Sequence, residues 1–328
     1  MNASSSFRLA GLAVAALLAT SAQAQVDPAQ GYPAKPIRVI VGFTAGGGTD
    51  VVARLVGQKI SEAFGQPLVV ENRIGASGII AAEYVAKAVP DGYTLLVSPS
   101  TVFTINPIMF AKLSYSPTQD FVPISKAVSF PFVLVVSSSQ PIRSMKELVD
   151  FVKANPGKAN YGGPSGLFQL ALELFKQRTG TRVEYIPYKG SNEAVSAVMA
   201  GDVLMALLDT GPVSGPLKGG KIRGIAVTST ARMPLFPDIP TMSEAGLQGM
   251  DIEGWMGMFA PAGTPPPIVK KLQDEVIRIV KLPDVRARMY GLQLTPAGNT
   301  SVEFARSIGS DIERWKALAK AANIKPAN

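Results

Sequence analysis

Apolar residues along this chain follow two different periods, and the change between them defines the predicted elements. Residues 37–41 form a run that is apolar apart from Arg38, which is typical of a buried strand. In residues 48–64 the apolar side chains recur at helical spacing, as Val51, Val52, Leu55, Val56 and Ile60. A strand over 37–42 therefore leads into a helix, and the glycines at 46–48 lie in the turn between them.

The alternation of short strands and amphipathic helices continues along most of the chain. The predicted strands cover 37–42, 68–71, 94–98, 132–137, 183–187, 203–208, 223–229 and 255–260, with a further extended stretch at 120–128. The predicted helices cover 48–64, 77–89, 144–154, 167–179 and 191–200, and two later helices carry the apolar stripes Ile268, Leu272, Val276, Ile279 and Phe304, Ile308, Ile312, Trp315. This alternation favours two α/β units, each with a mostly parallel sheet covered by helices on both faces.

The first 24 residues follow a different pattern, that of a secretory signal peptide. Arg8 precedes an apolar run over 9–19, and Ala22-Gln23-Ala24 has the small-x-small form that signal peptidase cleaves. A membrane anchor is the alternative, but the run is about half of the roughly 20 apolar residues that a span requires. We therefore predict cleavage after Ala24 and a soluble, exported protein that begins at Gln25.

Composition excludes several kinds of chemistry. The chain has no His and no Cys, so imidazole catalysis, imidazole metal ligands, thiolate metal sites and disulfides are all excluded. The formal net charge of +8 becomes +7 when Arg8 leaves with the signal peptide, which modestly favours an anionic ligand. Lys and Arg form no run longer than the pair Lys270-Lys271 and have no interleaved aromatic residues, so we expect no nucleic-acid binding.

The glycine turn at 46–48 is a candidate anion site. A turn from a strand into a helix exposes unpaired amides and the positive end of the helix dipole, and glycine lets an anion approach the main chain. A tight packing turn is the simplest alternative. A dinucleotide-binding turn is another, with Glu71 at the end of the second strand as the ribose-binding acid, although Val51 stands where the third glycine of that fingerprint belongs. Asp50 would repel an anion unless it caps the turn or holds water.

A second glycine-rich turn favours the anion site. The segment 160–175, NYGGPSGLFQLALELF, again has a glycine- and serine-rich turn that runs into a helix, with Ser165 in the turn and Gln169 one helical turn further on. Two such turns, one in each predicted unit, are therefore expected to face each other across a cleft.

The chain resembles the solute-binding receptors of tripartite tricarboxylate transporters, known as the Bug (Bordetella uptake gene) family. The motifs that carry this resemblance extend through nearly the whole mature chain: Tyr32-Pro33-x-Lys35-Pro36-Ile37, Gly46-Gly47-x-x-Asp50-x-x-Ala53-Arg54, Val70-Glu71-Asn72-Arg73-x-Gly75-Ala76-x-Gly78, Pro90-Asp91-Gly92-Tyr93-Thr94-Leu95, Asn106-Pro107, Asp120-Phe121-x-Pro123, Pro187-Tyr188-Lys189-Gly190, Pro237-Asp238-Ile239-Pro240-Thr241-x-x-Glu244-Ala245-Gly246 and Pro261-Ala262-Gly263-Thr264-Pro265.

The resemblance implies a two-lobed periplasmic binding protein of type II-like fold, joined by crossing strands. Residues 25–130 and 250–328 would form lobe 1, and residues 131–249 lobe 2. Such a receptor captures a small carboxylate between its lobes and hands it to a membrane permease. We expect a periplasmic monomer that is not an enzyme, with no cofactor and no metal.

In this family the loop after the first strand and the glycine-rich loop of the second lobe hold one carboxylate of the ligand, largely through main-chain donors and ordered water. The resemblance assigns to these two loops the ligand-binding residues Phe43, Thr44, Ala45, Gly46, Gly47, Asp50, Gly163, Ser165, Gly166 and Gln169. It places Tyr188, Lys189 and Asp209 nearby, with Ser98 and Ser100 on the rim of the first lobe. Gln169 stands where the family commonly has His, and it cannot carry a charge. Simpler roles are packing for Tyr188, capping for Asp209 and solvation for Lys189.

An NAD(P)-binding oxidoreductase that uses the 46–48 turn and Glu71 is the alternative function. No Ser-x-x-Lys motif is present, so a Ser-Lys hydrolase is not indicated. The sequence does not identify which carboxylate is bound.

Overall fold

The computed structural model describes residues 28–155, 157–164 and 166–326, so the predicted signal peptide and the predicted ligand contact Ser165 lie outside the described residues. The strands are β1 (Ile37–Val41), β2 (Leu68–Asn72), β3 (Thr94–Pro99), β4 (Phe121–Ser137), β5 (Asn160–Gly163), β6 (Glu184–Pro187), β7 (Met205–Asp209), β8 (Ile222–Val227), β9 (Glu253–Pro261) and β10 (Thr295–Pro296). The helices are α2 (Gly48–Phe64), α3 (Ile79–Ala86), α4 (Asn106–Met109), α5 (Met145–Ala154), α6 (Gly166–Thr179), α7 (Ser191–Ala200), α8 (Thr210–Lys218), α9 (Pro266–Ile279), α10 (Pro283–Gly291) and α11 (Ser301–Ala321), with a 3₁₀ turn at Ala76–Gly78 and a π-helical segment at Thr101–Ile105.

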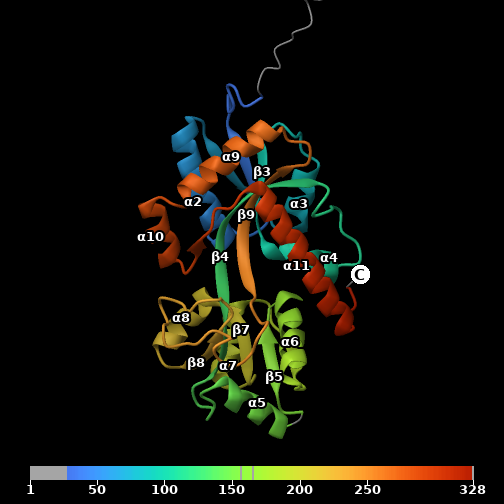
Figure 1. The fold of residues 1–328 in the computed structure, drawn as a ribbon, viewed down its shortest axis with the longest axis vertical. Helices are drawn as coiled ribbons and strands as arrows, with labels where there is room; N and C mark the ends of the chain where they lie inside the picture. Colours follow the sequence, from blue (N-terminus) through green and yellow to red (C-terminus); the bar gives the residue numbers. More distant parts are fainter. Residues whose placement is uncertain (1–27, 156, 165, 327–328) are drawn as a thin grey trace, which may run out of the picture.

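Two lobes share one continuous path of strands, β2-β1-β3-β9-β4-β7-β5-β6 (Figure 1). In lobe 1, β1 pairs in parallel with β2 and β3, and β9 is antiparallel to both β3 and β4. In lobe 2, β5 pairs in parallel with β6 and β7, and β4 is antiparallel to β7 and β8. Each lobe therefore has three parallel strands, and the strands that cross between the lobes are antiparallel to their neighbours.

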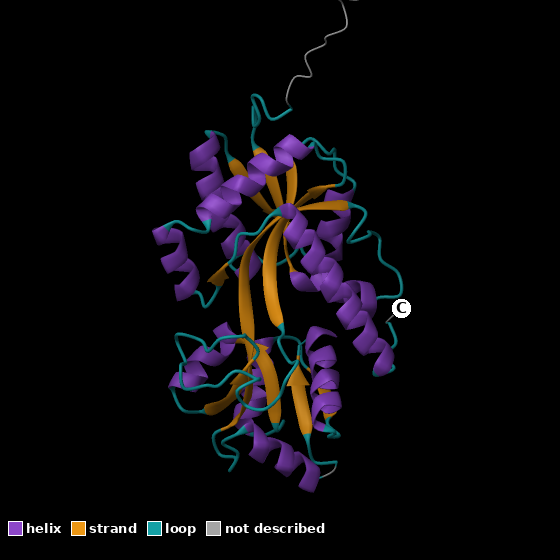
Figure 2. Ribbon diagram, viewed as in Figure 1, coloured by secondary structure: helices purple, strands orange, loops and turns teal. Residues whose placement is uncertain are grey.

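The crossing strand β4 is a single strand of 17 residues. The sequence predicted separate extended segments at 120–128 and 132–137, and this break is wrong. Residues 121–131 pair with β9, and residues from Phe132 onward pair with β7 and β8 (Figure 2). Pro131 has no N–H to donate, and it lies where the strand changes partners. The amide of Phe132 restores pairing by donating to the Thr228 hydroxyl (2.9 Å).

Side chains of the lobe 1 strands alternate between two apolar layers. On one face Val39 and Val41 of β1 pack with Val56 of α2 and Leu272 of α9. On the other face Ile40 joins a cluster that includes residues of α3 and α11. This period of two within the strand places helices on both faces, as the sequence predicted.

Lobe 2 repeats this arrangement. Met205 and Leu207 of β7 point into a layer with α5 and α6, whereas Ala206 and Leu208 point into a layer with α7 and α8. The carboxyl ends of β5 and β7 therefore meet the first turns of α6 and α8 at the same edge of the sheet. That edge faces lobe 1.

Helix α11 packs on both lobes, beside the crossing strands (Figure 1). Phe304 and Ile308 lie in a lobe 1 cluster, whereas Trp315 and Leu318 join the main cluster of lobe 2. The predicted boundaries at 130/131 and 249/250 stay a prediction. Among the described helices, including α11, we find none with the length and hydropathy that a membrane span needs.

Three helices did not stand out in the sequence. Helix α8 contains Pro212 and Pro216 together with two glycines, all of which disfavour a helix in isolation. Helix α10 begins with Pro283 and buries only Val285 and Met289, so its apolar stripe is short. Helix α4 is four residues long. Tertiary packing rather than intrinsic propensity stabilises these segments.

The close approach of α11 to β9 gives a test of this packing. A Cβ atom at Gly257 would overlap the ring of Phe304. We expect Gly257→Val to lower the free energy of unfolding by about 1–3 kcal/mol because the overpacked core must shift. Gly309→Ala on the same helix has open space around its Cβ, and we expect it to stabilise the protein by about 0.5–1 kcal/mol. Urea unfolding of both variants measures the difference, and equal stability of Gly257→Val and the parent chain would contradict this packing.

Candidate functional site

A cavity of about 860 Å³ lies between the two lobes, at the edge of each sheet where strands lead into helices. Lobe 1 contributes the loop after β1, the segment after β3 and the first turn of α2. Lobe 2 contributes the first turns of α6 and α8. The crossing strands β4 and β9 form the wall that links them, through Phe130, Phe132, Gly254 and Met256.

Each glycine of the first loop has a different backbone role. Gly46 has a positive φ of 77°, which favours glycine. Gly47 is extended (φ −71°, ψ 164°) and precedes α2, and Gly48 is the first residue of the helix. Among the three, only Gly46 therefore adopts the left-handed conformation that favours glycine. The amide of Gly47 donates to the Thr44 carbonyl (3.1 Å), so it is not available to a ligand.

Asp50 holds the first loop in place from outside the cavity. Its carboxylate accepts hydrogen bonds from the Gly46 amide (2.9 Å), from Asn72 Nδ2 (2.9 Å) and from the guanidinium of Arg54 (2.9 and 3.0 Å). The Arg54 hydrogen bond is the main reason that the pKa of Asp50 falls to about 2. The residue is 2% exposed and does not line the cavity. Its negative charge is therefore paired with Arg54 and does not repel an anion in the cavity.

The first turn of α2 presents donors to the cavity. Within the described residues, the amides of Gly48 and Thr49 have no hydrogen-bond acceptor, and both residues line the cavity. The Thr49 side chain is 6% exposed, and its hydroxyl also has no partner in the described part of the chain. These donors lie at the positive end of a 17-residue helix, where an anion is stabilised. Thr49 was not among the predicted site residues.

The first turn of α6 presents a second set of donors. Gly166, Leu167 and Phe168 line the cavity, and no described residue accepts a hydrogen bond from their amides. A Cβ atom at Gly163 would lie 2.7 Å from Phe168 Cβ, so glycine allows this turn to fold back closely against β5. Gly163 positions the turn without lining the cavity.

Methionine side chains lie beside both helix starts. A Cβ atom at Gly166 would lie 2.6 Å from Met109 Cγ, and one at Gly48 would lie 3.2 Å from Met256 Cε. Met109 belongs to lobe 1 and Gly166 to lobe 2, so the lobes contact each other here. Methionine is flexible and adapts its shape to a ligand.

Lobe 2 also contributes two charged side chains to the cavity. The carboxylate of Asp209, at the end of β7, accepts a hydrogen bond from the Ser191 hydroxyl (2.6 Å), and burial raises its pKa. Its side chain makes no capping hydrogen bond to α8. Lys189 is exposed at the rim and forms no ion pair with any described residue.

Of the predicted site residues, seven line this one cavity: Phe43, Thr44, Gly47, Ser100, Gly166, Lys189 and Asp209. The others that the structure describes lie outside its lining: Ala45, Gly46, Asp50, Ser98, Gly163, Gln169 and Tyr188. Among them, the Ser98 hydroxyl donates to the Pro99 carbonyl (3.3 Å), and the Tyr188 ring packs beside Gly162. Gln169 is half-buried on α6, directly after the cavity-lining Phe168.

Sequence reasoning missed most of the apolar side chains in the cavity wall. They come from several elements: Ile105, Met109, Phe110, Phe130, Phe132, Leu167, Phe168, Leu292 and Leu294. Met256 of β9 also lines the cavity. The period of two in β9 was the available signal, because it places Met256 and Trp255 on opposite faces.

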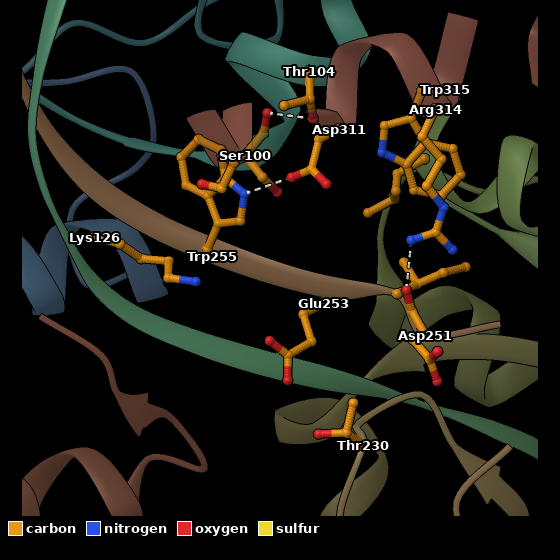
Figure 3. A pocket seen from close by; sticks show the side chains of 13 residues that line it. Ser100, Thr104, Lys126, Thr230, Asp251, Glu253, Trp255, Asp311, Arg314 and Trp315 are labelled. Carbon is orange, nitrogen blue, oxygen red and sulfur yellow. Dashed lines mark hydrogen bonds between the residues drawn. The ribbon is translucent and has the colours of Figure 1, made fainter. Parts of the chain in front are cut away.

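The other face of the crossing strands has a smaller hollow of about 240 Å³ (Figure 3). Its side chains include Trp255 from β9 and Asp311 and Arg314 from α11. The Trp255 indole N–H donates to Asp311 Oδ2 (3.3 Å), and Arg314 donates to the Asp251 carbonyl (2.8 Å). These contacts attach α11 to β9 and to the segment that precedes it. No group of three or more metal-ligating side chains is present among the described residues.

Glu71, the acid of the dinucleotide alternative, has other partners. Its carboxylate pairs with Arg38 (2.7 Å) and Arg73 (2.6 Å), and the Arg38 hydrogen bond is the main cause of its lowered pKa. Glu71 does not line the cavity.

Comparisons with known proteins agree with this architecture. The model of a family described as the tripartite tricarboxylate transporter family receptor matches residues 52–324. Protein BugT of Bordetella pertussis (strain Tohama I) is 33% identical over 311 residues, covering 94% of this chain and 95% of BugT.

Solved structures are similar over nearly their whole length. R. palustris Rpa4515 with adipate has 33% identity and a TM-score of 0.79, covering 90% of this chain and 100% of that one. MatC from Rhodopseudomonas palustris with bound malate has 31% identity and a TM-score of 0.74, covering 88% and 99%. These likenesses confirm the two-lobed α/β fold and support the receptor interpretation, not the oxidoreductase one. The chain therefore belongs to the receptor family of tripartite tricarboxylate transporters, and it is a solute-binding receptor.

Proposed function

We propose that this receptor captures a small carboxylate in the cavity between its lobes, at the starts of α2 and α6. The observation that carries the proposal is that the amides of Gly48 and Thr49, together with the Thr49 hydroxyl, have no hydrogen-bond partner in the described part of the chain. Each hydrogen bond to a charged group contributes about 1.5–3 kcal/mol, so a few such bonds approach the roughly 8 kcal/mol of micromolar affinity.

In this proposal the two lobes hold the ligand together. One carboxylate accepts hydrogen bonds from the first turn of α2 in lobe 1 and from Gly166 and Leu167 in lobe 2. Binding both lobes at once favours the closed form, because the open form offers the ligand only one set of donors. Adipate in Rpa4515 and malate in MatC support a carboxylate as the ligand. Among the predicted residues, Thr44, Ser100 and Lys189 are proposed as further contacts, whereas Gly47, Asp50 and Gly163 are proposed to position the two turns.

The proposed partner is the membrane permease of a tripartite tricarboxylate-type transporter, which would receive the ligand from a monomeric receptor. We also propose a periplasmic location, in keeping with the family. The chain expressed with residues 1–24 should then yield a periplasmic product whose intact mass corresponds to a start at Gln25. A product that keeps the first 24 residues would contradict the cleavage site.

Removal of the Thr49 hydroxyl tests the site. We expect small carboxylic acids to raise the melting temperature of the protein, and a ligand at a hundredfold above its Kd to add about 2.7 kcal/mol of stability. Thr49→Val keeps the shape of the side chain but loses the donor, so the Kd from calorimetry should rise at least about tenfold. Thr118→Val, at an exposed position outside the cavity, is the matched control. Unchanged carboxylate affinity in Thr49→Val would show that the ligand binds elsewhere.

Substitution of Asp50 tests how the first loop is organised. Because the folded pKa of about 2 is below the ordinary 3.8, ionised Asp50 stabilises the fold above about pH 4, and this contribution is lost as the pH falls towards 2. We expect Asp50→Asn to lower the free energy of unfolding at pH 7 by about 1–3 kcal/mol and to weaken carboxylate binding.

Chemical denaturation of Asp50→Asn at several pH values measures this effect. The stability difference from the parent chain should shrink as the pH drops from about 4. Glu62→Gln, a half-exposed acid on the same helix, should change neither stability nor binding appreciably. If Asp50→Asn lowers the free energy of unfolding by the same amount at every pH, the carboxylate charge is not what holds the loop.

A further inference from the structure

We propose that the ligand is a monocarboxylate with an apolar body and a hydrogen-bond donor at its far end, which Asp209 receives. This inference rests on the proposed function, because it takes the carboxylate to bind at the starts of α2 and α6. It adds the chemistry of the rest of the ligand and names the residue that selects it.

The body of the cavity is apolar and largely aromatic. Phe132 lies edge-on to Phe130 (ring centroids 5.8 Å apart) and to Phe168 (5.3 Å). All three rings line the cavity, where Ile105, Met109 and Phe110 of lobe 1 join them. An apolar ligand body gains free energy from burial against such a wall, whereas a polar one loses hydration without new hydrogen bonds.

Asp209 is the only described cavity-lining residue with an acidic side chain. It pairs directly with Phe132 across β7 and β4, so it lies at the end of the aromatic wall. Ser191 donates one hydrogen bond to it, and none of the described Lys or Arg side chains forms an ion pair with it. A carboxylate has about four acceptor positions, so Asp209 keeps acceptor capacity for a hydroxyl or ammonium group.

The same geometry disfavours a second carboxylate on the ligand. Two carboxylates that share a site repel each other, and a partly desolvated site strengthens the repulsion. Lys189 is the cation that could offset it. Its side chain is exposed at the rim, where water weakens its field. Selection against dicarboxylates therefore follows from Asp209.

Two matched series of acids test this selection by isothermal calorimetry. The first series is benzoate, 4-hydroxybenzoate and terephthalate, and the second is hexanoate, 6-hydroxyhexanoate and adipate. Each series keeps the body constant and changes only the far end. In at least one series we expect the hydroxy acid to bind most tightly, by about tenfold or more over the dicarboxylate, with the unsubstituted acid between them.

Variants assign the preference to Asp209. Asp209→Asn removes the charge but keeps an acceptor, so the ratio of dicarboxylate Kd to hydroxy-acid Kd should fall towards one. Asp238→Asn makes the same change at an exposed position of lobe 2 away from the cavity, and it should leave the ratio unchanged. Retention of the full ratio in Asp209→Asn would overturn the assignment.

The remaining outcomes separate this inference from the proposed function. If the dicarboxylates bind most tightly in both series, and Lys189→Met removes that preference, the function stands but the far end is a second carboxylate site. If none of the six acids binds, while the folded protein shows a normal melting temperature, the carboxylate site itself is refuted and the inference falls with it.

Discussion

An α-helix cannot pair the amides of its own first turn, and this constraint connects the fold of this receptor to its function. Two helices, α2 and α6, begin at the same cavity from opposite lobes, and their first amides have no acceptor among the described residues. Water can satisfy such amides in an open cleft. An anion satisfies them better, because it also meets the positive ends of both helix dipoles. A ligand that binds both sets of donors therefore draws the lobes together.

The connection between the lobes restricts how they can move. Strand β4 passes through both sheets and changes partners at Pro131 and Phe132, while β9 crosses beside it. Helix α11 packs on both lobes on the side opposite the large cavity, where Trp255 and Arg314 attach it to neighbouring segments. When the lobes bend relative to each other where β4 changes partners, the contacts of α11 must either persist or be replaced by others. The lobes therefore have few ways to move, and the ligand acts on this restricted motion.

Local sequence patterns predicted most of the secondary structure and both glycine turns. They failed where local propensity and tertiary context disagree. The pattern predicted two segments within β4, yet the strand continues through Pro131, because a strand that changes partners can accommodate a residue without an N–H. The prolines and glycines of α8 concealed a helix that packing against β8 and α7 stabilises. The motifs also predicted the family correctly, because a family is recognised from ordered residues and not from their three-dimensional contacts.

The sequence by itself determined the alternation of strands and helices, the family, and the two turns at which helices begin, since these depend on spacing along the chain. Only the tertiary structure decided which groups face the cavity. It turned the Asp50 carboxylate towards Arg54, placed Thr49 at the cavity, and brought Phe132 beside Asp209 from a distant part of the chain. The physical reason is that burial and hydrogen-bond partners arise from contacts between remote segments, which a local pattern does not encode.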